Sequence, residues 1–115
     1  MVNWIPLASI AEVEELVQQS ETVPCLIFKH SIRCSISSFA KQRLEQSWDL
    51  PVENIQPFYL DLINYREVSN YIADHFAIEH ESPQILLIER GKVVYDASHL
   101  AISVDDIRDQ LLAAS

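Results

Sequence analysis

The sequence contains little glycine. Gly91 is its one glycine among 115 residues, where an average composition would give about eight. Loops that hold nucleotide phosphates need several glycines, because a missing Cβ lets the backbone approach the phosphate closely. Neither a P-loop nor a dinucleotide-binding motif can be written from this sequence. Nucleotide-binding sites of these two kinds are therefore excluded.

Cysteine and positive charge are also scarce. Cys25 and Cys34 are the only cysteines, too few for a disulfide-stabilised scaffold. The net charge of −9 makes nucleic acid and anionic membranes poor partners. No apolar run approaches the roughly 18–20 residues of a membrane-spanning helix. Residues 1–6 lack the basic and apolar pattern of a secretory signal, so we expect a cytoplasmic protein.

Hydrophobic residues make up 49% of the chain, which is enough for one core, and we expect a single domain over residues 1–115. Periodicity and capping signals predict helices at 10–19, 34–48, 64–76 and 103–113. Ser9, Asn64 and Ser103 are the expected capping residues of the first, third and fourth of these helices. Apolar runs predict strands at 23–28, 56–62, 84–89 and 92–96, the last two joined by a turn at Arg90-Gly91.

The predicted order is α-β-α-β-α-β-β-α. Right-handed crossovers make the first two strands parallel, and the final hairpin adds an antiparallel edge. This is the order of a thioredoxin-like α/β fold, with a central mixed sheet of about four strands flanked by helices. The usual first strand of that fold would be reduced to Asn3–Pro6 or absent.

Cys34 follows the first predicted buried strand and begins the next helix. Unpaired backbone N–H groups and the helix dipole favour an anion there. The anionic thiolate is the form of cysteine that acts as a nucleophile. Ser37 stands where a dithiol motif would carry its second cysteine. We therefore predict a redox site with one cysteine, in which Cys25 is buried core and too far away to resolve a disulfide.

Three segments together resemble the thioredoxin-like monothiol bacilliredoxin family of the bacillithiol system. They are Phe28-Lys29-His30-Ser31, Cys34-Ser35-Ile36-Ser37 and His80-Glu81-Ser82-Pro83-Gln84. The order of elements and the length fit from about Trp4 to the C-terminus. The sequence departs from the typical motif at Ser35, where a proline would follow the cysteine. That change restores a backbone donor near the sulfur.

The resemblance implies a monothiol thiol–disulfide oxidoreductase that removes bacillithiol from mixed disulfides on client proteins. Cys34 would attack the bacillithiol sulfur and release the reduced client. A second bacillithiol would then clear Cys34, so bacillithiol is a co-substrate and no bound cofactor is expected. The resemblance also implies a cis peptide bond before Pro83, packed opposite Cys34. The backbone of Ser82 would be free to pair with a bound substrate strand.

Other residues around Cys34 carry secondary hypotheses. No acidic residue occurs in 22–44, which has a charge of +4 and leaves −13 for the rest of the chain. Arg33 would stabilise the thiolate or bind an anionic thiol such as bacillithiol, which carries malate carboxylates. Ser37 either stabilises the thiolate or only satisfies a backbone N–H. Lys41 and Arg43 fit a solvated helix face, and Lys29 a strand end that reaches solvent.

Several alternatives remain open at this stage. The chain could be a non-catalytic thioredoxin-like binding or adaptor module that docks through residues 29–43. Cys34 could instead reduce peroxide through a sulfenic acid, although no resolving cysteine is near. His30 is either a general base for the thiol or a hydrogen-bonded loop histidine. The spacing of the histidines and cysteines fits no metal site.

Overall fold

The computed structural model describes residues 2–113 and has the predicted order of elements. The bounds are β1 (Ile5–Pro6), α1 (Ile10–Gln19), β2 (Cys25–His30), α2 (Ser35–Ser47), β3 (Gln56–Asp61), α3 (Arg66–Phe76), β4 (Gln84–Glu89), β5 (Lys92–Ser98), a 3-10 turn η1 (His99–Ala101) and α4 (Val104–Ala113). The thioredoxin-like α/β prediction is confirmed.

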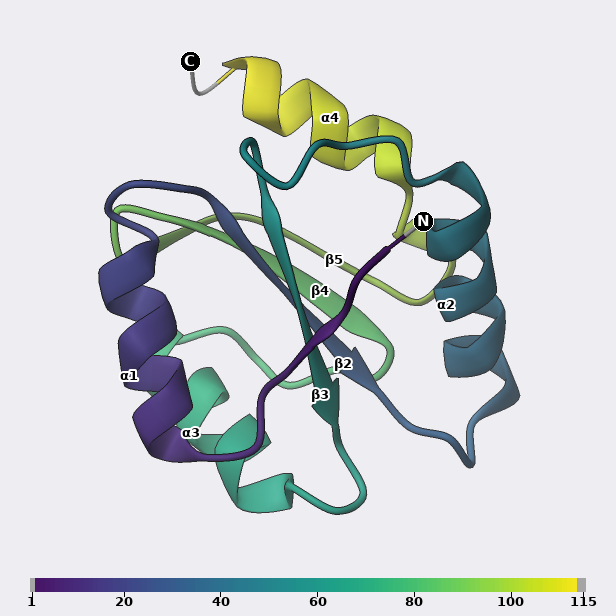
Figure 1. Ribbon diagram of the computed structural model, residues 1–115. Coiled ribbons are helices and arrows are strands. Elements are labelled where there is room, and N and C mark those ends of the chain that lie inside the picture. The colour runs from purple at the N-terminus through teal and green to yellow at the C-terminus, as the bar shows by residue number, and fades with distance from the viewer. Residues whose placement is uncertain (1, 114–115) are drawn as a thin grey trace.

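The five strands form one mixed sheet in the order β1-β3-β2-β4-β5 (Figure 1). β2 pairs in parallel with β3 and antiparallel with β4, and β5 completes a hairpin with β4. The reduced first strand is present as β1, two residues that pair with β3. Arg90 and Gly91 both have positive φ, 52° and 75°, which is the turn geometry that joins twisted strands in a two-residue hairpin.

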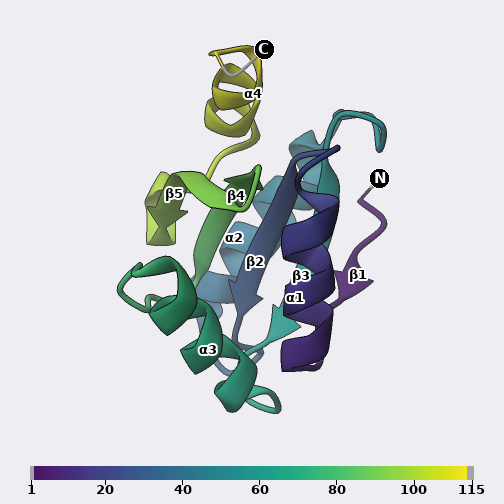
Figure 2. The same cartoon turned by 90° about the vertical axis from the view of Figure 1, so that its left-hand side faces the viewer.

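Helices cover both faces of the sheet. α1 and α3 lie on one face, in front of the sheet in Figure 2, and α2 lies behind it. The central strand β2 is buried along its whole length. Its alternate side chains contribute to different cores: Cys25 and Ile27 pack with α1 and α3, while Leu26 and Phe28 pack with α2 and α4. The remaining two residues of β2, Lys29 and His30, bring polar atoms into these cores.

The predicted caps hold for α1 and α4 and fail for α3. The hydroxyl of Ser9 accepts a hydrogen bond from the Glu12 N–H at 3.1 Å, and Ser103 caps α4 in the same way at 3.2 Å. Asn64 does not cap α3. Its backbone N–H and side-chain amide both donate to the carboxylate of Asp61, so the helix begins after Tyr65 without a side-chain cap.

Helix α2 is less amphipathic than its sequence suggests. Ala40 and Leu44 are buried, but Ile36 is 46% exposed and Phe39 is 50% exposed. A helical spacing of apolar residues predicted that these two would share the buried face. The buried position near the start of the helix is instead occupied by the polar Ser37.

Candidate functional site

Two loops meet at one end of the sheet. β2 ends at His30 and leads to Cys34, while β4 begins one residue after Pro83. Lys29 is paired with Gln84, so the Ser82-Pro83 segment lies beside the end of β2. The peptide bond between Ser82 and Pro83 is cis, which confirms what the family resemblance implied. The fold therefore places the two motif segments at the same end of the sheet.

Cys34 is the N-cap residue of α2. It has an extended backbone, its side chain makes no capping hydrogen bond, and its thiol is free and partly exposed. Its N–H donates to the Ser31 carbonyl at 3.1 Å, which closes the turn before the helix. Arg33 and Ser35 flank it and are both exposed. The sulfur therefore sits at the positive end of the helix dipole.

Ser37 is fully buried one turn into α2. Its hydroxyl accepts a hydrogen bond from the N–H of Ser31 at 3.1 Å and lies 2.6 Å from Nδ1 of His30. The first contact is the one that the sequence predicted for this serine, in which its hydroxyl satisfies a backbone N–H. The second joins it to a histidine whose involvement with Ser37 the sequence did not suggest.

His30 is 4% exposed and is held between aromatic rings. The centroids of Phe28 and Tyr59 both lie 5.6 Å from that of the imidazole. Burial lowers the pKa of His30, and the nearby Lys41 lowers it further, although Asp61, Ser37 and Glu45 act in the opposite direction. The lowered pKa favours the neutral imidazole over the imidazolium.

The hydroxyl of Ser82 is buried and has no hydrogen-bond partner among residues 2–113. A buried polar group without a partner costs free energy, so it marks a place where a ligand or water can bind. The carbonyl of the next residue, Pro83, accepts a hydrogen bond from the His99 N–H at 3.0 Å. The cis-proline segment is thus tied to η1 on one side and carries a buried hydroxyl without a partner.

Lys29 does not reach solvent, and the sequence-based expectation for it was wrong. It is fully buried against α3, where its ammonium donates to the Ser69 carbonyl at 3.3 Å and lies 3.4 Å from Nδ1 of His80. Burial lowers the pKa of Lys29 to about 8. Burial together with the positive charges of Lys29 and Arg66 lowers the pKa of His80. This contact links β2 and α3 to the segment that precedes Pro83.

Cys25 is the second thiol and is part of the core. It is fully buried, and burial raises the pKa of its thiol to about 12. Its sulfur is within 3.5 Å of the Val23 carbonyl and 3.9 Å of the Leu16 carbonyl. These contacts hold it on the face of α1, at the end of β2 opposite to Cys34.

The positive surface around Cys34 is smaller than the acid-free stretch suggested. Lys29 is buried, and Lys41 forms an ion pair with Glu45 at 2.7 Å. Arg43 places its guanidinium 5.9 Å from the Phe39 ring and donates to the Leu100 carbonyl. The exposed Arg33 is therefore the cation that remains closest in sequence to the thiol.

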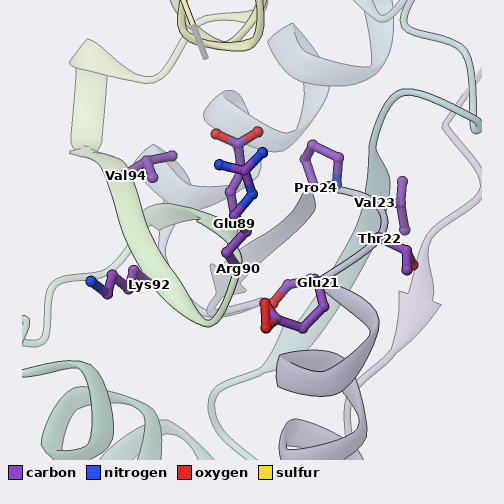
Figure 3. Close-up of a pocket in the computed structure, with 9 residues that line it drawn as sticks. Glu21, Thr22, Val23, Pro24, Glu89, Arg90, Lys92 and Val94 are labelled. Carbon is purple, nitrogen blue, oxygen red and sulfur yellow. The ribbon is translucent and has the colours of Figure 1, made fainter. Parts of the chain in front are cut away.

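A cavity of about 680 Å³ lies at the other end of the sheet (Figure 3). It is formed by the loop between α1 and β2 and by the β4–β5 hairpin. Its charged side chains, Glu21, Glu89, Arg90 and Lys92, balance one another in sign. It contains neither cysteine nor histidine, so it offers no group for thiol chemistry.

Residues 2–113 contain neither a metal-binding cluster nor a membrane-spanning helix. No group of three or more histidine, cysteine or acidic side chains is placed to bind a metal ion. No helix in this part of the chain is long and apolar enough to cross a membrane.

Several proteins of known structure share the fold of this chain, and one family model matches most of its length. A family model described as "Monothiol bacilliredoxin BrxC" matches residues 5–107. A solved thioredoxin-fold protein, provisionally described as an oxidoreductase, is 27% identical, with a TM-score of 0.78 over 92% of this chain and 91% of its own. Thioredoxins of Malassezia sympodialis and Trypanosoma brucei brucei have TM-scores of 0.75 and 0.72 at 8% and 11% identity. They cover 98% and 97% of this chain, and 91% and 90% of their own lengths.

Proposed function

Because the chain belongs to the monothiol bacilliredoxin family, we propose that it removes bacillithiol from mixed disulfides on proteins, with Cys34 as the nucleophile. The observation that carries this proposal is the position of Cys34. It is a free, partly exposed thiol at a helix N-terminus, at the end of the sheet where the cis Ser82-Pro83 segment lies.

The proposed reaction has two exchange steps. The Cys34 thiolate attacks the bacillithiol sulfur of the client's mixed disulfide. The client–bacillithiol S–S bond breaks, a Cys34–bacillithiol bond forms, and the client leaves as a thiolate that takes a proton from water. A second bacillithiol thiolate then attacks this new disulfide. It regenerates the Cys34 thiolate and leaves as bacillithiol disulfide, so the client thiol is freed at the expense of the second bacillithiol, which is oxidised into that disulfide.

Each remaining site residue has a proposed part in these steps. Ser37 cannot form a disulfide, so Cys34 stays in the monothiol reaction. Arg33 and Ser35 are exposed beside the sulfur, where a guanidinium and a hydroxyl favour a thiolate and an anionic ligand. Ser82 offers an unpartnered hydroxyl and the backbone before Pro83 to the bound substrate. Free thiols need a reducing compartment, so we place the reaction in the cytoplasm.

The test uses a purified protein that carries one bacillithiol on a surface cysteine. The wild type is expected to release bacillithiol from it when free bacillithiol is present, and Cys34→Ala is expected to have no activity above buffer. Cys25→Ala is the matched control and should keep the activity. Equal activity in Cys34→Ala and the wild type would overturn the proposal. Slow alkylation of Cys34 at pH 6 would favour a binding module instead.

A further inference from the structure

The hydroxyl of Ser37 has only one proton, and its contacts limit where that proton goes. A serine hydroxyl donates once and accepts twice. The Ser31 N–H uses one acceptor position at 3.1 Å. Nδ1 of His30, at 2.6 Å, either accepts the serine proton or donates its own proton to the oxygen. The direction of this one contact therefore decides whether Ser37 has a proton left for another partner.

The thiol of Cys34 is the partner that helix geometry places next to Ser37, and no hydrogen bond joins the two side chains in this structure. Cys34 is the N-cap of α2 and Ser37 its third residue, a pair whose side chains are neighbours in helix geometry. When Nδ1 carries no proton, Ser37 donates to His30 and has nothing for the sulfur. When Nδ1 carries a proton, Ser37 accepts from His30 and from Ser31, and its own proton is free for the thiolate.

His30 has a route for exchanging its proton. Its second ring nitrogen, Nε2, has no hydrogen-bond partner in the described part of the chain, and the residue lines a cavity of about 360 Å³ together with Ser38 and Tyr59. Water in this cavity can take a proton from Nε2 or return one. The ring stays in place meanwhile, because it is packed between Phe28 and Tyr59.

The charges that face His30 come from two elements. Lys41 and Glu45 lie on α2, and Tyr59 and Asp61 lie on β3. Burial and Lys41 together outweigh the two carboxylates and lower the pKa of His30. The lowered pKa favours the neutral ring, which has two tautomers, over the imidazolium.

We propose that His30 is a positioning residue that draws the proton of Cys34 away through Ser37. The Cys34 S–H proton passes to the Ser37 oxygen, the Ser37 proton passes to Nδ1, and the Nε2 proton leaves to water in the cavity. One proton is released to solvent, and the thiolate then accepts a hydrogen bond from Ser37. The inference rests on the proposed function in one respect: both require Cys34 to react as a thiolate.

The direct test is ¹⁵N NMR of the imidazole across a pH titration of the wild type, with His30 assigned from its loss in His30→Asn. We expect the proton on Nε2 while Cys34 is a thiol and on Nδ1 once Cys34 is a thiolate. In Ser37→Ala and Cys34→Ala the tautomer should no longer follow that transition. A tautomer that stays fixed in the wild type would overturn the proposal. The measurement involves no bacillithiol, so its failure is separate from failure of the proposed function.

Alkylation kinetics supply a second test. Loss of a charge-assisted hydrogen bond to the thiolate lowers the thiolate fraction about tenfold. The thiolate that remains is more nucleophilic, so the alkylation rate falls only about threefold. Ser37→Ala and His30→Phe should therefore react with iodoacetamide about threefold more slowly than the wild type at pH 7. His30→Asn, whose amide can donate to Ser37 without changing tautomer, should lose less than twofold. Ser47→Ala, at an exposed position at the end of α2, is the matched control and should be unchanged. A wild-type rate in folded Ser37→Ala would contradict the inference.

Discussion

Cys25 and Cys34 lie only nine residues apart in the sequence but have opposite environments. Cys25 is enclosed by apolar side chains, which disfavour its charged form and raise its pKa to about 12. Cys34 is partly exposed at the start of a helix, where the unpaired N–H groups favour a negative charge. At the residue scale, the proposed reaction with one cysteine depends on the burial of Cys25 as much as on the absence of a second cysteine in the motif.

Selective alkylation follows from this difference. In the native protein at pH 7.5, iodoacetamide is expected to modify Cys34 completely while Cys25 stays unmodified, because a buried thiol forms almost no thiolate and cannot be reached. Peptide mapping after a short exposure measures both sites. After unfolding in guanidinium both should react. Modification of Cys25 at a rate comparable to Cys34 in folded protein would contradict the description of the core.

In the proposed reaction, Ser37 is the residue that keeps Cys34 from closing a disulfide within the motif. We expect Ser37→Cys to form an intramolecular disulfide with Cys34, because the two positions have the spacing of a dithiol motif. After reaction with bacillithiol disulfide, this variant should be two mass units lighter than its reduced form and should keep no adduct. The matched variant Ser38→Cys lies one residue further along the helix and should not form that disulfide. A stable bacillithiol adduct on Ser37→Cys would show that the two side chains do not meet.

At the scale of elements, local signals were predicted well and long-range contacts were not. The caps at Ser9 and Ser103 depend on residues three positions away, so the sequence contains the whole interaction. The cap expected at Asn64 fails because Asp61, at the end of the preceding strand, binds both donors of that residue.

The position of Cys34 and the cis bond before Pro83 were predictable once the order of elements indicated the fold. The burial of Lys29 was not, because its partners Ser69 and His80 lie 40 and 51 residues further along the chain. The contact between His30 and Ser37 spans only seven residues, but it crosses from a strand to a helix. Only the packing of α2 on the sheet shows which side chains share a face.

The exposed apolar side of α2 gives a stability prediction. Leu44→Ala should lower the free energy of unfolding by about 2–5 kcal/mol, because it leaves a cavity in the core between α2 and the sheet. Phe39→Ala should lower it by less than about 1 kcal/mol, since half of that side chain is already exposed. Urea unfolding followed by circular dichroism compares the two. Equal losses would mean that α2 packs through its whole apolar stripe.

At the scale of the whole molecule, Lys29 connects the sheet, α3 and the segment before Pro83 through one buried ammonium group. The pKa of this group is about 8 in the folded protein against 10.5 when it is exposed. Between these values the unfolded chain binds more protons than the folded one. The stability of the fold therefore rises with pH across this range as far as Lys29 is concerned.

Lys29→Met should remove this dependence. Between pH 8 and 9 the unfolding free energy of the wild type is expected to rise by about 1 kcal/mol relative to that of Lys29→Met. Cys25 acts in the opposite direction, because its thiol keeps a proton in the fold that the unfolded chain loses. It does so in both proteins, so its effect cancels in the comparison. Parallel pH profiles for the two proteins would show that Lys29 is not buried as a charged group.

The measurement that tests the central claim most directly is the intact mass of the protein after exposure to bacillithiol disulfide and, separately, to glutathione disulfide. The proposed function predicts one bacillithiol on Cys34, formed faster than any glutathione adduct, and no adduct on Cys34→Ala. An unmodified wild-type protein, or the same adduct on Cys34→Ala, would contradict the account. Faster reaction with glutathione disulfide would contradict the assignment of bacillithiol as the co-substrate.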